Sequence, residues 1–324
     1  MLRIGYKLIA EAYSPQEIVR QGVAAERAGF DFVEVSDHYH PWLYATPHSG
    51  FVWSMLGALA VRTETIELAT GVTCPTMRYH PAVIAQASAT TALLAEGRFT
   101  LGVGSGERLN EHVVGDRWPS ITVRQEMLRE AIEIIRLLWS GGYHSYDGRY
   151  LRLDDARVFD LPSEQPEIAV AAGGQRSARI AAELGDALFA TEPKPGLTNA
   201  YSVAGGTGRR FAEVPLAWGP DVETAAHSAY EKFRFGLTGW KIQSELPNPI
   251  NFEAATAHVT RDHLREAFGC GPDPQRHIDV ARKFADAGFD QLALIDAGPD
   301  PHGFFDYFAS ELGPELRGTV RPRT

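Results

Sequence analysis

The sequence predicts one (β/α)8 TIM barrel with insertions on the rim at the carboxyl ends of its strands. The chain has 324 residues, a length at which a single barrel is common. An alanine-rich helix that ends near a glycine and continues into a short apolar strand recurs at residues 25–37, 92–106, 181–191 and 284–298. This alternation of helix and strand indicates a parallel sheet, and a count of eight strands favours its closure into a barrel.

The expected strands are apolar runs without strict polar alternation, as in strands that are covered on both faces. They lie near residues 2–9, 30–37, 66–73, 98–104, 167–172, 186–190, 210–218 and 290–296. Glycine directly after a helix supplies the left-handed backbone conformation that closes the last turn, which explains the repeated join.

Helices are expected between these strands and after the last one. They lie near residues 15–28, 50–62, 81–95, 122–139, 176–184, 222–235, 274–287 and 303–312. A further helix near residues 195–205 has only a weak signal.

Two segments do not follow the repeat, and both are interpreted as insertions in a single domain spanning residues 1–324. Residues 142–165 alternate like a small hairpin with a turn at Asp147-Gly148. Residues 236–272 contain several glycines and prolines and follow the seventh strand. Their place after a strand predicts that they lie on the catalytic rim, where they could form a lid.

Composition excludes several classes of protein. With 41 acidic and 31 basic residues the formal charge is -10, which disfavours binding to nucleic acid or to an anionic membrane. Cys74 and Cys270 are far apart, which argues against a disulfide framework and suits a reducing compartment. The amino terminus reads as a strand rather than a signal peptide, so a cytoplasmic protein is expected.

Polar, glycine and aromatic residues follow the strands, where barrels of this kind build their active sites. In chain order they are Glu11, Asp37, His38, His40, Trp42, Cys74, Ser105, Gly106, Glu107, Asn110, Gly173, Gly174, Lys194, Trp218 and Asp296. Because the carboxyl ends of parallel strands meet at one rim, this pattern predicts an enzyme.

His38 is the candidate for acid–base chemistry, because the ordinary histidine pKa lies near neutrality. It could equally be a rim histidine bonded to Asp37. Glu107 follows a glycine-rich turn and could face a ligand, or it could serve as the first residue of a helix. Trp42 could stack on a flat ring or plug the barrel mouth.

The glycines suit close approach of a ligand to the backbone. The run GVGSGE at 102–107 lacks the G-x-G-x-x-G spacing of a dinucleotide fingerprint. Gly173 and Gly174 precede a helix whose free amides would suit a phosphate, or they form a plain helix entry. Lys194 is a candidate for binding an anion, with an ordinary surface lysine as the alternative. Cys74 is interpreted as a small apolar filler.

A metal-dependent barrel hydrolase is a competing interpretation. His38-x-His40 resembles the paired histidines of such enzymes, and Asp296 ends the last strand. The pair follows the second strand rather than the first, however, and no histidine closes the fifth or sixth strand. No metal site is therefore predicted.

Four segments carry a resemblance to a known family. They are VSDHYHPW at 35–42, TGVTCPTMRYHPAVIAQASAT at 70–90, LGVGSGERLNE at 101–111 and IAVAAGG at 168–174. They resemble the luciferase-like superfamily, within it the coenzyme F420-dependent oxidoreductases of the glucose-6-phosphate dehydrogenase-like branch. The resemblance implies a barrel, often a homodimer, that transfers a hydride between a small alcohol or carbonyl substrate and C5 of the deazaflavin. An FMN-dependent monooxygenase of the same superfamily is the nearest alternative.

The resemblance also implies roles for individual residues. His38 would be the base, Glu107 the acid at ring nitrogen N1, and Trp42 would steady the charged intermediate, with Glu11 lining the substrate pocket. The cofactor would contact Asp37, Val72, Cys74, Ser105, Gly106, Asn110, Ala172, Gly173 and Gly174. A cis peptide other than at proline is implied at or next to Val72.

The resemblance implies the fold and the cofactor more strongly than it implies the substrate. Lys194 and Lys241 match the two lysines with which the family's glucose-6-phosphate enzyme holds the phosphate. The arginine that completes that site has no secure counterpart, since Arg265 is only nearby. Cys74 replaces an expected threonine.

Overall fold

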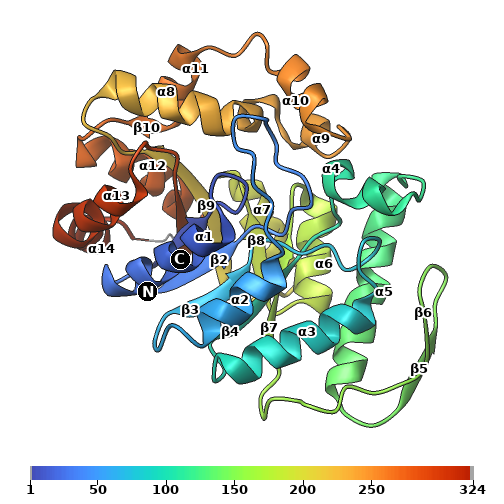
Figure 1. Cartoon of the computed structure of the whole chain (residues 1–324). Helices are drawn as coiled ribbons and strands as arrows, with labels where there is room; N and C mark the ends of the chain where they lie inside the picture. The colour runs from blue at the N-terminus through green and yellow to red at the C-terminus, as the bar shows by residue number, and fades with distance from the viewer. Residues whose placement is uncertain (1, 322–324) are drawn as a thin grey trace.

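The computed structural model describes residues 2–321 and contains a closed barrel of eight parallel strands (Figure 1). The strands are β1 (Arg3–Leu8), β2 (Phe32–Val35), β3 (Glu67–Thr70), β4 (Phe99–Val103), β7 (Glu167–Ala171), β8 (Ala187–Ala190), β9 (Arg210–Ala217) and β11 (Gln291–Asp296). Pairing of β11 with β1 and of β8 with β9 closes the circuit. The predicted fold class and all eight predicted strands are confirmed.

The outer layer consists of helices that cover the barrel. They are α1 (Pro15–Arg27), α2 (Val52–Ala60), α3 (Pro81–Leu94), α5 (Ile121–Trp139), α6 (Gln175–Leu184), α7 (Pro195–Val203), α8 (Val222–Phe233), α12 (Pro274–Asp286), α13 (Pro301–Tyr307) and α14 (Gly313–Thr319). The expected helix at 303–312 is α13 followed by a π turn at Phe308–Leu312, and the chain stays helical beyond it. None of the helices within residues 2–321 is long and apolar enough to cross a membrane.

Local sequence signals explain the ends of these helices. Pro15 begins α1 and the Ser14 hydroxyl accepts the amide of Glu17, which caps the helix. Gly29 and Gly288 follow α1 and α12 with φ angles of 86° and 92°, a conformation that strains any residue with a Cβ. The helix–glycine–strand join therefore has the geometry that the sequence predicts.

Residues 142–165 form the expected hairpin, but in a different place. β5 (His144–Asp147) and β6 (Arg152–Ala156) connect α5 to β7, so the hairpin lies on the outside of the barrel against α5 rather than on the rim. Its turn covers residues 148–151 instead of Asp147-Gly148. The reason is Glu130 of α5, whose carboxylate accepts the amides of residues 149–151 at 2.8 to 3.0 Å.

Residues 236–272, unlike the hairpin, follow a strand of the barrel, β9, and so lie at the carboxyl ends of the strands. They contain the end of the 3-10 turn η2 (Arg234–Thr238), α9 (Trp240–Gln243), α10 (Pro249–Ala255), α11 (Arg261–Ala267) and the two-residue strand β10 (Gly269–Cys270). Figure 1 shows these elements with α8 and the short helix α4 (Arg108–Glu111) at one end of the barrel. We call residues 236–272 the rim insertion.

Candidate active site

A cavity of about 650 Å³ opens at the carboxyl ends of the strands, beneath the rim insertion. The predicted site residues that line it are Glu11, Asp37, His38, Trp42, Val72, Cys74, Ser105, Gly106, Glu107, Ala172, Gly173, Gly174 and Lys241. Asn110 and Lys194 do not line it. The structure thus brings together residues from six separate parts of the chain, five of which directly follow strands, as their places in the sequence predict.

His38 lies between two carboxylates. Its Nδ1 is 3.3 Å from Oε1 of Glu11 and its Nε2 is 3.5 Å from Oε1 of Glu107. Nδ1 is also 3.3 Å from the carbonyl oxygen of His40. Two acceptors at Nδ1 favour the tautomer that carries its hydrogen there, which leaves the lone pair of Nε2 for a proton from a ligand.

Glu107 occupies both of the positions that the sequence analysis gave as alternatives, at the start of a helix and facing the cavity. It is the N-cap residue of α4, and it also lines the cavity. Its Oε1 accepts a hydrogen bond from the side-chain amide of Asn110, whose own oxygen accepts the amides of Tyr39 at 2.8 Å and His40 at 3.1 Å. Asn110 therefore ties the loop after β2 to the acid after β4.

Trp42 forms part of the cavity wall. Its ring lies 4.7 Å from the His38 ring, centroid to centroid, and stacks on Phe235 at 4.6 Å with an interplanar angle of 12°. The indole is held from behind by Phe252, edge to face at 5.0 Å. Packing on three sides fixes the orientation of Trp42 beside the histidine.

Asp37 lines the cavity, but its carboxylate is held by protein groups. It accepts hydrogen bonds from Thr73 Oγ1 at 2.8 Å, Arg78 Nη2 at 2.9 Å and the Tyr79 hydroxyl at 3.2 Å. Arg78 also lies 3.6 Å from Glu111, and burial raises the pKa of Glu111 to about 7 despite that positive charge. Sequence reasoning missed Arg78 and Glu111, because they lie on a loop and a helix turn that only the fold brings to Asp37.

The chain bends after β3 in the way that the resemblance implied. The peptide bond between Gly71 and Val72 is cis, and Val72 lines the cavity. Gly106 approaches the same bend so closely that a Cβ would lie 2.7 Å from Cys74 Sγ. Burial raises the pKa of the Cys74 thiol well above its ordinary value, and this fits the interpretation of Cys74 as a buried filler.

Gly173 and Gly174 stand at the amino end of α6, and Gly174 is its N-cap residue. A Cβ on Gly174 would meet no protein atom within 4 Å, so this turn opens onto free space. The free amides at a helix start attract anions.

A buried charged cluster forms the floor of the cavity and was not predicted. Lys7 Nζ lies 2.5 Å from Glu213, 3.5 Å from Glu34 and 2.5 Å from the carbonyl oxygen of Gly71, to which it donates. Burial raises the pKa of Glu34 to about 8. The sequence signal was a charged residue within an apolar strand, but it gave no indication of the partners.

Two predicted cationic positions differ in their surroundings. Lys194 does not line the cavity, and its ammonium group pairs at 2.6 Å with Glu192, which does. Lys241 of α9 lines the cavity and is exposed. Arg265 is paired with Glu223 and lies 3.4 Å from Asp262, also outside the cavity. The structure therefore does not gather these three cations into one site.

The two histidines of the His38-x-His40 pair diverge. His40 Nδ1 lies 3.0 Å from the carbonyl oxygen of Leu109, whereas His38 lies between glutamates inside the cavity. Within residues 2–321, no three His, Cys, Asp or Glu side chains are grouped in a way that could hold a metal ion.

Known proteins resemble this chain over nearly its whole length. The luciferase-like monooxygenase family model matches residues 3–291. The chain belongs to the luciferase-like monooxygenase family. An F420-dependent glucose-6-phosphate dehydrogenase of Segniliparus rotundus is 36% identical, with 98% of each chain covered. Its counterpart in Microbacterium testaceum is 35% identical, again with 98% of each chain covered.

Two solved structures have the same fold as this chain. An F420-dependent secondary alcohol dehydrogenase in complex with an F420-acetone adduct superposes with a TM-score of 0.90 at 29% identity, covering 98% of this chain and 99% of that one. The coenzyme F420-dependent tetrahydromethanopterin reductase of Methanopyrus kandleri has a TM-score of 0.76 at 21% identity, covering 97% and 99%. The latter likeness supports the fold alone.

Proposed function

We propose that this luciferase-like protein is a coenzyme F420-dependent oxidoreductase that transfers a hydride between C5 of the deazaflavin and an alcohol or carbonyl compound. The observation that carries the proposal is His38, placed between Glu11 and Glu107 at the wall of a cavity of about 650 Å³. The relatives named as F420-dependent dehydrogenases support the choice of cofactor.

The cavity fits a flat ring with an anionic tail. The turn at Gly174 opens to free space at the start of α6, where backbone amides suit a phosphate. Oε2 of Glu11 is buried at the cavity wall without a hydrogen-bond partner, so it can accept a donor from a ligand. Residues that would hold the cofactor are Asp37, Val72, Cys74, Ser105, Gly106, Ala172, Gly173 and Gly174, with Asn110 supporting Glu107 from behind.

The residues around His38 can move the protons of such a reaction. When bound, the cofactor supplies a hydride acceptor and donor at C5. We assign His38 Nε2 to accept the hydroxyl proton of the substrate while Glu11 holds Nδ1. Glu11, the ring of Trp42, and Glu107 once it has given up its proton would stabilise the imidazolium that results. The side-chain amide of Asn110 donates to Oε1 of Glu107. We therefore assign the other oxygen of Glu107, Oε2, to carry a proton for a nitrogen of the deazaflavin ring.

Titration of the purified protein with F420 and with FMN, followed by quenching of ring fluorescence, tests the cofactor. We expect binding of F420 in the micromolar range and reduction of bound F420 by an alcohol. Binding of FMN without binding of F420 would support the monooxygenase alternative instead.

We also infer a cytoplasmic homodimer that acts on a small molecule. The two buried free cysteines support a reducing compartment, and the net charge of -10 disfavours nucleic acid as a partner. Size-exclusion chromatography with light scattering checks the dimer, and a single-chain mass would contradict it.

A further inference from the structure

We propose that the substrate is an uncharged alcohol or carbonyl compound with a hydrophobic substituent, and not a phosphorylated sugar. This inference rests on the proposed function and names the substrate class of the same site. Two features of the cavity carry it: an aromatic wall beside the catalytic histidine, and the pairing of the surrounding cations.

The aromatic wall consists of Trp42, Phe233 and Phe235. Phe235 stacks on Trp42 at 4.6 Å and on Phe233 at 5.4 Å, so the three rings form one continuous surface. All three line the cavity. The wall begins 4.7 Å from the His38 ring, so a substrate whose hydroxyl reaches Nε2 must lay its neighbouring groups along these rings.

Further apolar side chains extend this surface around the cavity. They are Pro215, Leu237, Trp240, Ala267, Phe268 and Ile295. Such a lining favours a hydrophobic substituent, because moving methylene groups from water to an apolar surface is favourable. A polyhydroxylated sugar would leave several hydroxyl groups facing carbon atoms.

Cations at the cavity are paired or otherwise bonded, with one exception. Lys7 pairs with Glu213, Arg124 with Glu245 at 3.0 Å through Nη2, and Arg176 with Glu126. Nε and Nη1 of Arg124 are buried and have no hydrogen-bond partner among the described residues. Lys232 donates to the Tyr13 hydroxyl at 2.9 Å and to the carbonyl oxygen of Gly298 at 2.5 Å. Among the lining cations, Lys241 alone has no recorded partner in the part of the chain that the structure describes.

Carboxylates face the same space. Glu11, Glu107, Glu111 and Glu213 all line the cavity, and Glu11 is 3.3 Å from the catalytic histidine. A phosphate dianion held by Lys241 alone would approach this acidic group without the lysine–arginine cluster that a sugar phosphate needs. Lys194 and Arg265, which could have completed such a cluster, do not line the cavity; Lys194 pairs with Glu192 at its edge, and Arg265 pairs with Glu223.

The chemistry is balanced for such a substrate. The carbinol carbon of the alcohol would give its hydrogen as hydride to C5 of F420, the ring nitrogen would take its proton from Glu107, and the hydroxyl proton would pass to His38 Nε2. Loss of the His38 proton and regain of one by Glu107 would then restore both groups. The carbon–oxygen bond becomes the carbonyl, and no other reactant is consumed.

The decisive experiment compares substrates on one enzyme preparation. F420 affinity is measured first by fluorescence, and failure of F420 to bind would refute the proposed function itself. With F420 bound, cyclohexanol, 2-butanol and glucose 6-phosphate are compared by kcat/KM for F420 reduction. We expect at least one uncharged alcohol to exceed glucose 6-phosphate by about 10²-fold or more. Equal or greater kcat/KM for glucose 6-phosphate, or no turnover of either alcohol by enzyme that binds F420, overturns the substrate assignment.

A matched pair of variants locates the hydrophobic contact. Phe235→Leu alters the cavity side of Trp42, whereas Phe252→Leu alters its other side and does not line the cavity. We expect Phe235→Leu to raise KM for cyclohexanol by about tenfold while Phe252→Leu leaves it within about twofold, with F420 affinity unchanged in both. Equal KM values in the two variants would show that the aromatic wall does not touch the substrate.

Discussion

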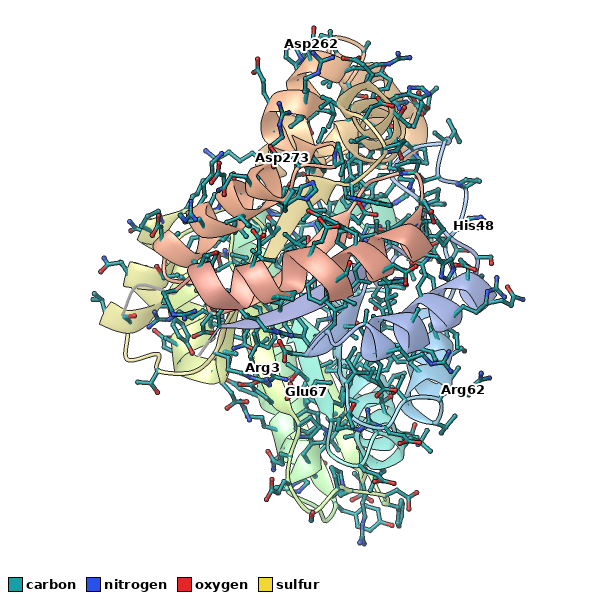
Figure 2. All side chains as sticks on the ribbon, turned by 90° about the vertical axis from the view of Figure 1, so that its left-hand side faces the viewer. Arg3, His48, Arg62, Glu67, Asp262 and Asp273 are labelled. Carbon is teal, nitrogen blue, oxygen red and sulfur yellow. The ribbon has the colours of Figure 1, made fainter. Side chains whose placement is uncertain are left out.

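The two ends of the barrel carry charged side chains in opposite arrangements. At the amino ends of the strands, Arg209 bonds Glu67 at 2.7 Å and Glu167 at 2.8 Å, and Glu67 also bonds Arg3 at 2.7 Å. Figure 2 shows Arg3 and Glu67 side by side, well below Asp262 of the rim insertion. This network uses its charges in ion pairs.

At the carboxyl ends most charged groups are also paired, but His38 and the two glutamates beside it are not bound to any lysine or arginine within the residues that the structure describes. His38 lies 3.3 Å and 3.5 Å from two glutamates, and one buried oxygen of Glu11 has no partner. Unpaired buried polar atoms reduce stability unless a ligand satisfies them. The comparison indicates that the amino end stabilises the barrel, whereas the carboxyl end keeps reactive groups at some cost in stability.

Substitution of His38 should have the largest effect. We expect His38→Ala to lower kcat for F420 reduction by about 10²- to 10⁴-fold, because it removes the proposed base, while F420 affinity stays within about threefold. His302→Ala is the control, since His302 pairs with Glu17 at 2.8 Å on the surface away from the cavity. A parallel loss of F420 binding in His38→Ala would show that the histidine is a cofactor ligand rather than a base.

Lys7 lies between the two ends, and its removal should cost stability. Lys7→Met leaves Glu213 and Glu34 without their buried cation, so we expect a loss of about 3–5 kcal/mol in the free energy of unfolding. Chemical denaturation measures it. The exposed pair Lys194–Glu192 gives the control, because Lys194→Met should change stability by only about 0–1 kcal/mol. Equal losses would refute the difference between buried and surface pairs.

Substitution of Arg209 tests only the ion-pair network at the amino ends of the strands. We expect Arg209→Met to lower the free energy of unfolding by about 2 kcal/mol at neutral pH without changing kcat. Burial opposes ionisation of Glu67, but the hydrogen bond and charge of Arg209 outweigh it and lower the pKa of Glu67 below 4.5. That stabilisation is present above pH 4.5 and is lost as pH falls through the lowered pKa, so the variant and the wild type should converge in acid. A large fall in kcat would contradict the division between the ends.

Glu34→Gln should cause the smallest loss of stability. Burial raises the pKa of Glu34 from 4.5 to about 8, so the carboxyl is protonated at neutral pH and glutamine resembles it. The wild type should lose stability as pH rises from 4.5 through about 8, because ionisation favours the unfolded chain, and the variant should lack this slope. We expect a change below about 1 kcal/mol near pH 4, where the carboxyl is protonated in the folded protein, and the variant should become the more stable protein as the pH rises toward 7, measured by denaturation across that range. A loss as large as that of Lys7→Met would mean that Glu34 is ionised.

The sequence predicted the barrel because each strand was marked by a local pattern. The helix–glycine–strand join fixed the order of elements, and Gly29 and Gly288 adopt the left-handed conformation that it requires. The strand β10 was missed because two residues carry no periodicity. The hairpin turn was misplaced because its geometry depends on Glu130, a contact from a different helix.

The site was predictable where residues follow strands directly, as His38 and Glu107 do. Pairings between distant segments were not. Lys194 looked free in the sequence, yet Glu192 two residues earlier neutralises it, and Arg78 reaches Asp37 only through the fold. Periodicity identifies which face a residue occupies but gives no information on which charge will stand opposite.

The rim insertion and the reacting residues come from different parts of the chain. The proposed proton-carrying groups follow β1, β2 and β4, whereas the segment from Phe233 to Phe268 supplies one side of the cavity over the strand ends, through residues at 233–245, 267 and 268. An exchange of that segment between relatives could therefore redirect the enzyme to new compounds while its catalytic groups stay unchanged. Many side chains that would contact the substrate therefore lie on a different segment from the reacting groups. That segment can vary in evolution, or be redesigned, without changing the reacting groups.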